Sequence, residues 1–305
     1  GTAIGQLPEA ATTVAGESFG GWMYNGELVT AETVFGAEVT AVTLTASFGW
    51  DGATVSTALE GEGTETNPYV LSSGANLAYL ANSVNGGEAY SGKYFVLSKN
   101  INMNFKAWTV IGQITKYESK TFEGKAFSGI LDGKNFAIEN LTNVLIEYAS
   151  GATVKNLQIS VNVSRKTIVG GLISVTRGSA CTIENVTVRG SVAGTVANVA
   201  GVVGNAQAAT MIKNCKNYAN ITSTVTSGFA FAGGILGSSN GTIVIDACEN
   251  YGNIKAERTM VGGIAGLPRK ASKSYIANCK NFGNVTASAQ VGGICGATRV
   301  RVEYS

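Results

Sequence analysis

The sequence Val261-Gly262-Gly263-Ile264-Ala265-Gly266, followed by Ile276-Ala277-Asn278-Cys279-Lys280-Asn281-Phe282-Gly283-Asn284-Val285, is one copy of a repeat that fills the second half of the chain. Copies of the glycine-pair motif begin at Val169, Val199, Ala232, Val261 and Val291, which are 30, 33, 29 and 30 residues apart. The place of Cys279 in the second motif is taken in earlier copies by Leu157, Val186, Cys215 and Cys248, with steps of 29, 29, 33 and 31 residues up to Cys279. Two motifs in a fixed order at a period near 30 residues indicate that each repeat is one supersecondary unit.

Stacked units of this length and composition predict a parallel β-solenoid. Parallel strands about 4.8 Å apart satisfy the backbone of one repeat with that of the next, and apolar residues at equivalent positions form a continuous core. A β-propeller blade needs about 40–45 residues for its four strands, which is longer than this repeat. The expected fold class is therefore all-β, a right-handed parallel β-helix. Ile212 and Cys215 differ in strand parity, so either a bend lies between them or one of them points outward.

The texture of the sequence divides the chain further. Residues 1–50 lack the repeat and are expected to form a small β-rich module, residues 51–66 a linker, and residues 67–305 the β-helix. Apolar residues at helical spacing before Gly86-Gly87 predict a short capping helix near residues 74–85. Strands are expected at residues 18–23, 27–29, 41–48, 94–97 and 108–112.

Two protein families resemble parts of this chain. The Val-Gly-Gly-Ile-Xaa-Gly copies, together with Phe122-Glu123-Gly124 and the segment 127–133, resemble the GLUG-motif family of bacterial surface β-helices over roughly residues 60–305. Phe19-Gly20-Gly21-Trp22 and Asn25-Gly26 resemble the later part of the Listeria–Bacteroides (internalin B-type) repeat, whose modules are β-grasp-like. These resemblances imply a secreted, adhesin-like bacterial surface protein, and they bring no catalytic residues.

The residue types present limit the chemistry. Histidine is absent, which excludes a Ser-His-Asp triad, zinc binding by histidine and the usual general base at neutral pH. Asp51, Asp132 and Asp246 are the only aspartates, and the last two lie several repeats apart rather than as a pair of catalytic carboxylates. We therefore expect no enzyme, no cofactor and no bound metal. The alternatives are a polysaccharide-active β-helix lyase or hydrolase, or a purely structural surface stalk.

The repeat arranges three kinds of side chain in columns. Because Cys215, Cys248 and Cys279 share their position with Leu157 and Val186, they are expected to be buried apolar residues rather than metal ligands. An aromatic residue follows three positions later, where strand parity turns it away from the core. The candidate glycan-binding surface consists of this aromatic column and the asparagines beside it: Tyr218, Tyr251, Phe282, Asn217, Asn250 and Asn281. The alternative is a packed aromatic ladder beside amides that bond to one another along the solenoid axis.

Charge and hydropathy bound the partners. Residues 1–150 hold 7 Lys and Arg against 15 Asp and Glu, whereas residues 151–305 hold 15 against 5. Basic residues near the aromatic column, Lys213, Lys216 and Lys280, favour an anionic glycan. No apolar run is long enough to cross a membrane. We expect a non-catalytic, extracellular protein at the bacterial surface that binds a glycan or a host extracellular protein, without nucleic acid and without membrane insertion.

Overall fold

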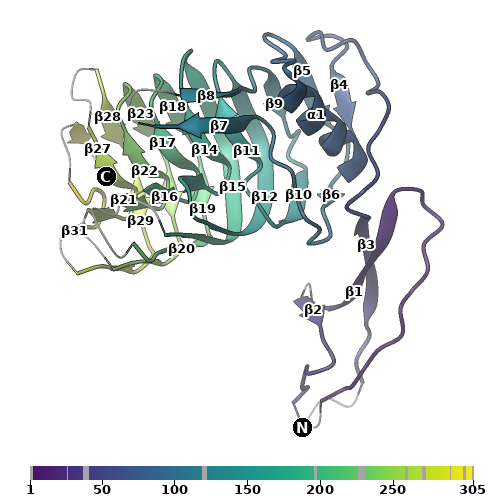
Figure 1. Cartoon of the computed structure of the whole chain (residues 1–305). Helices are drawn as coiled ribbons and strands as arrows, with labels where there is room; N and C mark the ends of the chain where they lie inside the picture. The colour runs from purple at the N-terminus through teal and green to yellow at the C-terminus, as the bar shows by residue number, and fades with distance from the viewer. Residues whose placement is uncertain are drawn as a thin grey trace.

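The computed structural model describes residues 3–25, 27–36, 41–118, 122–195, 198–225, 231–257, 260–269, 273–288, 290–297 and 300–303. From residue 69 onward the strands stack in parallel into a β-solenoid, which confirms the predicted fold class (Figure 1). Gly26, part of the internalin-like pattern, lies outside the described residues.

The first two strands of successive coils form one continuous sheet of 17 strands. The first strands are β4 (Tyr69–Leu71), β5 (Tyr94–Leu97), β9 (Ile130–Asp132), β12 (Thr153–Arg165), β15 (Cys181–Gly194), β18 (Thr210–Lys213), β23 (Ile243–Asp246), β28 (Tyr275–Ala277) and β32 (Arg301–Glu303). The long strands β12 and β15 also supply the second position, which elsewhere is filled by β6 (Ile101–Asn102), β10 (Ala137–Leu141), β19 (Lys216–Asn217), β20 (Asn220–Ser223), β24 (Glu249–Asn250), β25 (Ile254–Ala256), β29 (Lys280–Asn281) and β30 (Val285–Thr286).

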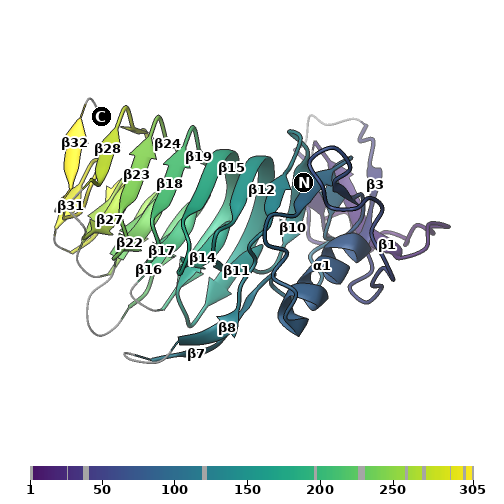
Figure 2. The same cartoon turned by 90° about the horizontal axis from the view of Figure 1, so that it is seen from above.

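Two five-stranded parallel sheets complete the coils (Figure 2). One contains β13 (Val169–Gly170), β16 (Asn198–Ala200), β21 (Phe231–Gly233), β26 (Val261–Gly262) and β31 (Val291–Gly292). The other contains β11 (Ile146–Ala149), β14 (Ile173–Thr176), β17 (Val203–Ala206), β22 (Leu236–Ser239) and β27 (Ala265–Pro268). Each glycine-pair motif therefore makes the tight passage between these two sheets.

A single residue with positive φ turns the chain within each second motif. Asn214 and Asn278 have φ of 51° and 54°, a conformation that asparagine tolerates better than most residues, and Ala247 holds the same place at 52°. Ile212 and Cys215, on either side of Asn214, are both fully buried. The strand bends at Asn214, so both side chains face the core, and this decides between the two alternatives that parity left open.

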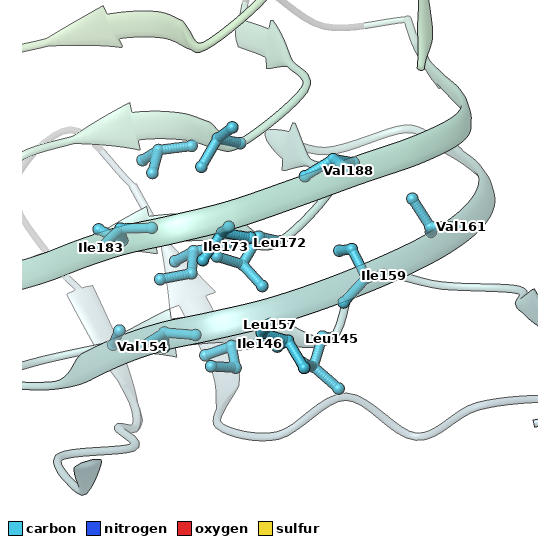
Figure 3. Close-up of a cluster of buried hydrophobic side chains, with 14 of the residues drawn as sticks. Leu145, Ile146, Val154, Leu157, Ile159, Val161, Leu172, Ile173, Ile183 and Val188 are labelled. Carbon is cyan, nitrogen blue, oxygen red and sulfur yellow. The ribbon is translucent and has the colours of Figure 1, made fainter. Parts of the chain in front are cut away.

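The core is a continuous column of aliphatic side chains. Figure 3 shows residues of neighbouring coils, such as Leu157 with Val188 and Ile146 with Ile173, gathered in the interior between the sheets. Cys215, Cys248 and Cys279 are fully buried in the same core, which confirms the prediction that this repeat position is interior and apolar.

The N-terminal residues form a separate three-stranded antiparallel sheet in the order β2 (Glu27–Val29), β1 (Glu17–Tyr24), β3 (Thr45–Trp50). It is tied to the solenoid by amides, because Asn102 Nδ2 donates to the Phe48 carbonyl at 3.0 Å and Asn104 Nδ2 to the Ser18 carbonyl at 3.2 Å. Helix α1 (Gly74–Gly86) lies at the N-terminal end of the stack (Figure 1). Its C-cap, Gly87, has φ of 117°, which explains why the glycine pair ends the helix.

Two expected strands differ from the structure. The strand expected at 108–112 is absent except for Ile111, which makes an isolated bridge to Ile146. The strand expected at 41–48 begins only at Thr45, because the residues before it have no paired neighbour among the described residues.

Candidate functional site

The aromatic column is exposed, but its rings are stacked on one another. Tyr218, Tyr251 and Phe282 have exposed fractions of 36%, 37% and 58%. The Tyr218 and Tyr251 ring centroids are 4.6 Å apart with an interplanar angle of 3°, and those of Tyr251 and Phe282 are 4.8 Å apart at 15°. The guanidinium of Arg189 lies 4.4 Å from the Tyr218 centroid, over its face. The faces of Tyr218 and Tyr251 are therefore covered, and the column presents ring edges to solvent.

The charges beside the column are paired. Lys216 Nζ lies 2.9 Å from Glu249 Oε2, and the Tyr251 hydroxyl donates to the same oxygen at 2.9 Å. The hydrogen bond with Glu249 raises the pKa of Lys216, and the hydrogen bond from Lys216 lowers the pKa of Glu249. Lys213 is the register neighbour of Asp246 in the adjacent coil. Of the basic residues that favoured an anionic glycan, Lys213 and Lys216 are thus interleaved with acidic ones.

The predicted glycan-binding amides are structural instead. Asn217 and Asn250 are fully buried. Asn217 Nδ2 donates to Asn250 Oδ1 and Asn250 Nδ2 to Asn281 Oδ1, both at 2.7 Å, and each Nδ2 also donates at 2.9 Å to the carbonyl two residues further along its own chain segment. Since their hydrogen-bonding capacity is spent within this amide ladder, Asn217 and Asn250 do not reach a ligand, which corrects that part of the prediction. Glycan binding at the exposed ring edges stays a prediction.

The amide ladder also explains the second glycine of each pair. A Cβ atom on Gly234 would lie 2.3 Å from Asn250 Cγ, and one on Gly263 would lie 2.3 Å from Asn281 Cγ. The glycine-pair motif and the asparagine motif therefore recur together because each asparagine side chain occupies the space that a glycine leaves open.

A different feature, which the sequence analysis did not identify, is a hairpin inserted into one wall of the solenoid. It consists of β7 (Gln113–Tyr117) and β8 (Phe122–Lys125), paired antiparallel. Ile111 pairs with Ile146 and Phe127 pairs with Ala149, so the neighbouring coil crosses in three residues a distance that this coil interrupts with the hairpin. Figure 2 shows the hairpin as a ribbon lying outside the coils of β11 and β14.

The hairpin is fixed to the wall beneath it near its tip. The Tyr117 hydroxyl accepts hydrogen bonds from Gln207 Nε2 and, at 3.3 Å, from Asn205 Nδ2. The Phe122 ring packs edge-on against Tyr148 at 4.8 Å, and Arg177 lies 4.5 Å from the Phe122 centroid. These contacts hold the hairpin against the outer face of the β11–β14–β17 sheet.

A cleft of about 550 Å³ lies between the hairpin and the solenoid. It is lined by four consecutive residues of β7 and by residues of β11, β14, β16 and the loop before β13: Ile114, Thr115, Lys116, Tyr117, Glu147, Lys166, Thr167, Ile168, Val175 and Asn198. This volume is within the usual range for ligand-binding clefts.

Polar groups in and beside the cleft lack partners. Asn198 is 8% exposed, and its Oδ1 accepts no hydrogen bond among the described residues. Arg165 forms an ion pair with Glu147 through Nη2, while its buried Nη1 is unpaired among the described residues. Buried polar groups normally have partners, so groups without one mark a place where a ligand can supply them.

Comparison with known proteins links the cleft region to a peptidase family. The family model of the M26 IgA1-specific metallo-endopeptidase N-terminal region matches residues 88–190. Over 81 residues the chain is 44% identical to an immunoglobulin A1 protease of Streptococcus sanguinis, which covers 26% of this chain and 4% of that protein. It is 29% identical over 171 residues to halomucin of Haloquadratum walsbyi, covering 52% of this chain and 2% of that protein. The chain thus spans a small part of these relatives.

Solved structures support the fold. A crystal structure described as a candidate immunoglobulin A1 protease from Bacteroides ovatus superposes with a TM-score of 0.60 at 20% identity, over 80% of this chain and 76% of that one. A structure of an IgA1 protease superposes with a TM-score of 0.52 at 24% identity, over 74% of this chain and 18% of that one. Among the described residues no helix is long and apolar enough to cross a membrane.

The family match corrects the expectation that the protein is not an enzyme. That expectation came from the missing histidine and the scattered aspartates, whereas residues 88–190 are similar to the N-terminal region of a metallo-endopeptidase. The described residues contain no group of three His, Cys, Asp or Glu side chains placed to bind a metal ion. The chain is a β-solenoid protein similar to the N-terminal region of IgA1-specific metallo-endopeptidases and to IgA1-protease-like structures.

Proposed function

We propose that this chain is the protein-binding region of an IgA1-protease-like protein at the bacterial surface, and that it binds immunoglobulin A1 at the hairpin cleft. The observation that carries the proposal is the overlap between the matched segment and the cleft. Residues 88–190 include the hairpin, Glu147, the loop 166–168 and Val175, which supply all the lining except Asn198. Immunoglobulin A1 is the protein named in the descriptions of the relatives.

The finer features of the sequence fit the same proposal. The Val-Gly-Gly-Ile-Xaa-Gly copies support a GLUG-type repeat for residues 67–305, preceded by the linker 51–66. The antiparallel sheet of β1, β2 and β3 supports an internalin-type module at residues 1–50. Such modules suit an extracellular, adhesin-like protein that holds a partner outside the cell, and a rigid solenoid keeps the binding surface in a fixed geometry.

The test is direct binding of the chain to immunoglobulin A1 by surface plasmon resonance, with immunoglobulin G as the control protein. Ile168 is half-buried at the cleft, so Ile168→Arg should fill the cleft and abolish binding. Tyr251→Ala, on the aromatic column, should leave binding unchanged. Absence of binding by the unmodified chain, or equal binding by Ile168→Arg, would show that the cleft does not have this role.

A further inference from the structure

The cleft follows one edge of strand β7. Among the described residues β8 is the only strand that pairs with β7, so the hairpin is a two-stranded sheet with an unpaired edge on each side. Four consecutive β7 residues, Ile114 to Tyr117, line the cleft, and no β8 residue does. Because successive side chains of a strand point to opposite faces, a cleft lined by every residue in a row lies along the edge of the strand rather than over one face.

A side chain occupies the start of this edge. The Ile114 N–H donates to Glu147 Oε2 at 2.9 Å, and Arg165 holds the Glu147 carboxylate through an ion pair. The carboxylate thus acts where the carbonyl of a neighbouring strand would accept. Beyond Ile114, no hydrogen bond from another part of the described chain reaches the backbone of Thr115, Lys116 or Tyr117 along this edge.

The opposite wall carries the unpaired acceptor. Asn198 lies in β16, and its buried Oδ1 faces a site that the protein leaves unfilled. Because an unmet buried acceptor is unfavourable, a ligand that brings an N–H donor to Asn198 gains more than it would at an exposed amide. A ligand with regularly spaced N–H and C=O groups meets both this acceptor and the strand edge.

We propose that an extended peptide segment of the partner protein binds in the cleft as a third strand on the free edge of β7, with one of its backbone N–H groups donating to Asn198 Oδ1. This inference rests on the proposed function, since it specifies how the bound protein is held. Strand addition of this kind draws its affinity from main-chain hydrogen bonds and its specificity from flanking side chains.

The charges at the cleft favour an acidic segment. Lys116 and Lys166 are both exposed at its rim. Lys116 lies 3.8 Å from Glu118, whereas Lys166 has no acidic partner among the described residues. Ile114, Ile168 and Val175 supply apolar contacts beneath. The segment that fits best therefore alternates apolar residues toward the wall with acidic residues toward the rim.

The probe is a blocked peptide as long as β7, five residues, that alternates valine and glutamate. Its matched control carries N-methyl groups on alternate backbone nitrogens, in either of the two registers, and keeps the same side chains. Titration calorimetry should show binding of the plain peptide and a loss of about tenfold or more for at least one methylated register. Hydrogen exchange at Thr115, Lys116 and Tyr117 should slow when the peptide is bound.

The Asn198→Ala variant separates recognition from folding. Since Asn198 Oδ1 has no partner in the protein, its removal should leave the unfolding midpoint unchanged while weakening the peptide several-fold. Lack of peptide binding, or equal binding of the plain and both methylated peptides, would overturn strand addition. If immunoglobulin A1 binds without slowing exchange in β7, the proposed function stands and this inference falls. If the peptide binds as expected and immunoglobulin A1 does not, the reverse holds.

Discussion

The aromatic column and the hairpin cleft lie on the same solenoid, yet they differ in how their polar groups and ring faces are used. In the column, Tyr218 and Tyr251 cover each other at 4.6 Å, and the amides behind them are bonded into a ladder. At the cleft, Asn198 Oδ1 has no partner among the described residues. Repetition brings like residues into contact, so each coil satisfies its neighbour. An insertion in one coil has no such neighbour, and its groups remain available for a ligand.

The largest effect is expected in the interior of the repetitive region. Cys248→Asp places a carboxylate in a fully buried position and should lower the free energy of unfolding by about 4 kcal/mol or more. Urea denaturation followed by circular dichroism measures the change. Cys248→Val is the control, with a loss below about 1.5 kcal/mol, because Val186 already occupies this position one repeat earlier. Equal losses for the two variants would contradict the interior placement.

Two asparagines compare the regions directly. Asn250→Ala removes a side chain bonded to Asn217, Asn281 and the Gly252 carbonyl, and should cost about 2–3 kcal/mol, because buried groups are left unpaired. Asn198→Ala removes an acceptor without a partner and should change the same free energy by less than about 0.5 kcal/mol. Equal costs at the two positions, measured by urea denaturation, would show that the difference between ladder and cleft is not real.

The buried thiols make the repetitive region sensitive to alkali. Burial raises the pKa of Cys248 above the ordinary value of 9.0. Because the folded pKa lies above the unfolded one, this contribution to stability is complete below pH 9 and is lost as the pH rises further. Between pH 9 and pH 10 the loss is about 1 kcal/mol per buried thiol.

Denaturation at these two pH values measures the effect, and Cys248→Val should lose about 1 kcal/mol less than the unmodified chain. Since other groups also titrate in this range, only the difference between the two proteins reports the thiol. An identical pH dependence would mean that Cys248 ionises as readily in the folded chain as in the unfolded one.

The sequence predicted what repeats and missed what does not. The period of the glycine pair and of Cys215, Cys248 and Cys279 was enough to predict the coils and their core, because stacking imposes the same environment at each copy. The bend at Asn214 was visible only as an unresolved choice, since one sequence does not report a positive φ. The hairpin had a single signal, the 36-residue step from Phe95 to its register partner Leu131, against 29 from Val154 to Ile183.

The unpaired state of Asn198 had no sequence signal at all. It depends on β16 lying next to the loop 166–168 and beneath the hairpin, which are segments far apart along the chain. The stacking of Tyr218 on Tyr251 was one of two alternatives, and only the ring planes decide between them. Positions defined by contacts between unlike segments are therefore the ones that require a structure.

The smallest expected change in stability is at the tip of the hairpin. Tyr117→Phe removes the hydroxyl that accepts from Gln207 and Asn205 while keeping the ring beside Phe122. Because these groups are exposed or only partly buried, the free energy of unfolding should fall by less than about 1 kcal/mol. Hydrogen exchange should nevertheless accelerate several-fold in β7 and β8, since the insertion has few other contacts to hold it closed. Tyr251→Phe, which removes a hydroxyl from the aromatic column, is the matched control and should leave exchange in the hairpin unchanged. If Tyr117→Phe also leaves it unchanged, the hairpin is held by the packing of Phe122 on Tyr148 and under Arg177, and the cleft keeps its shape without the Tyr117 hydroxyl.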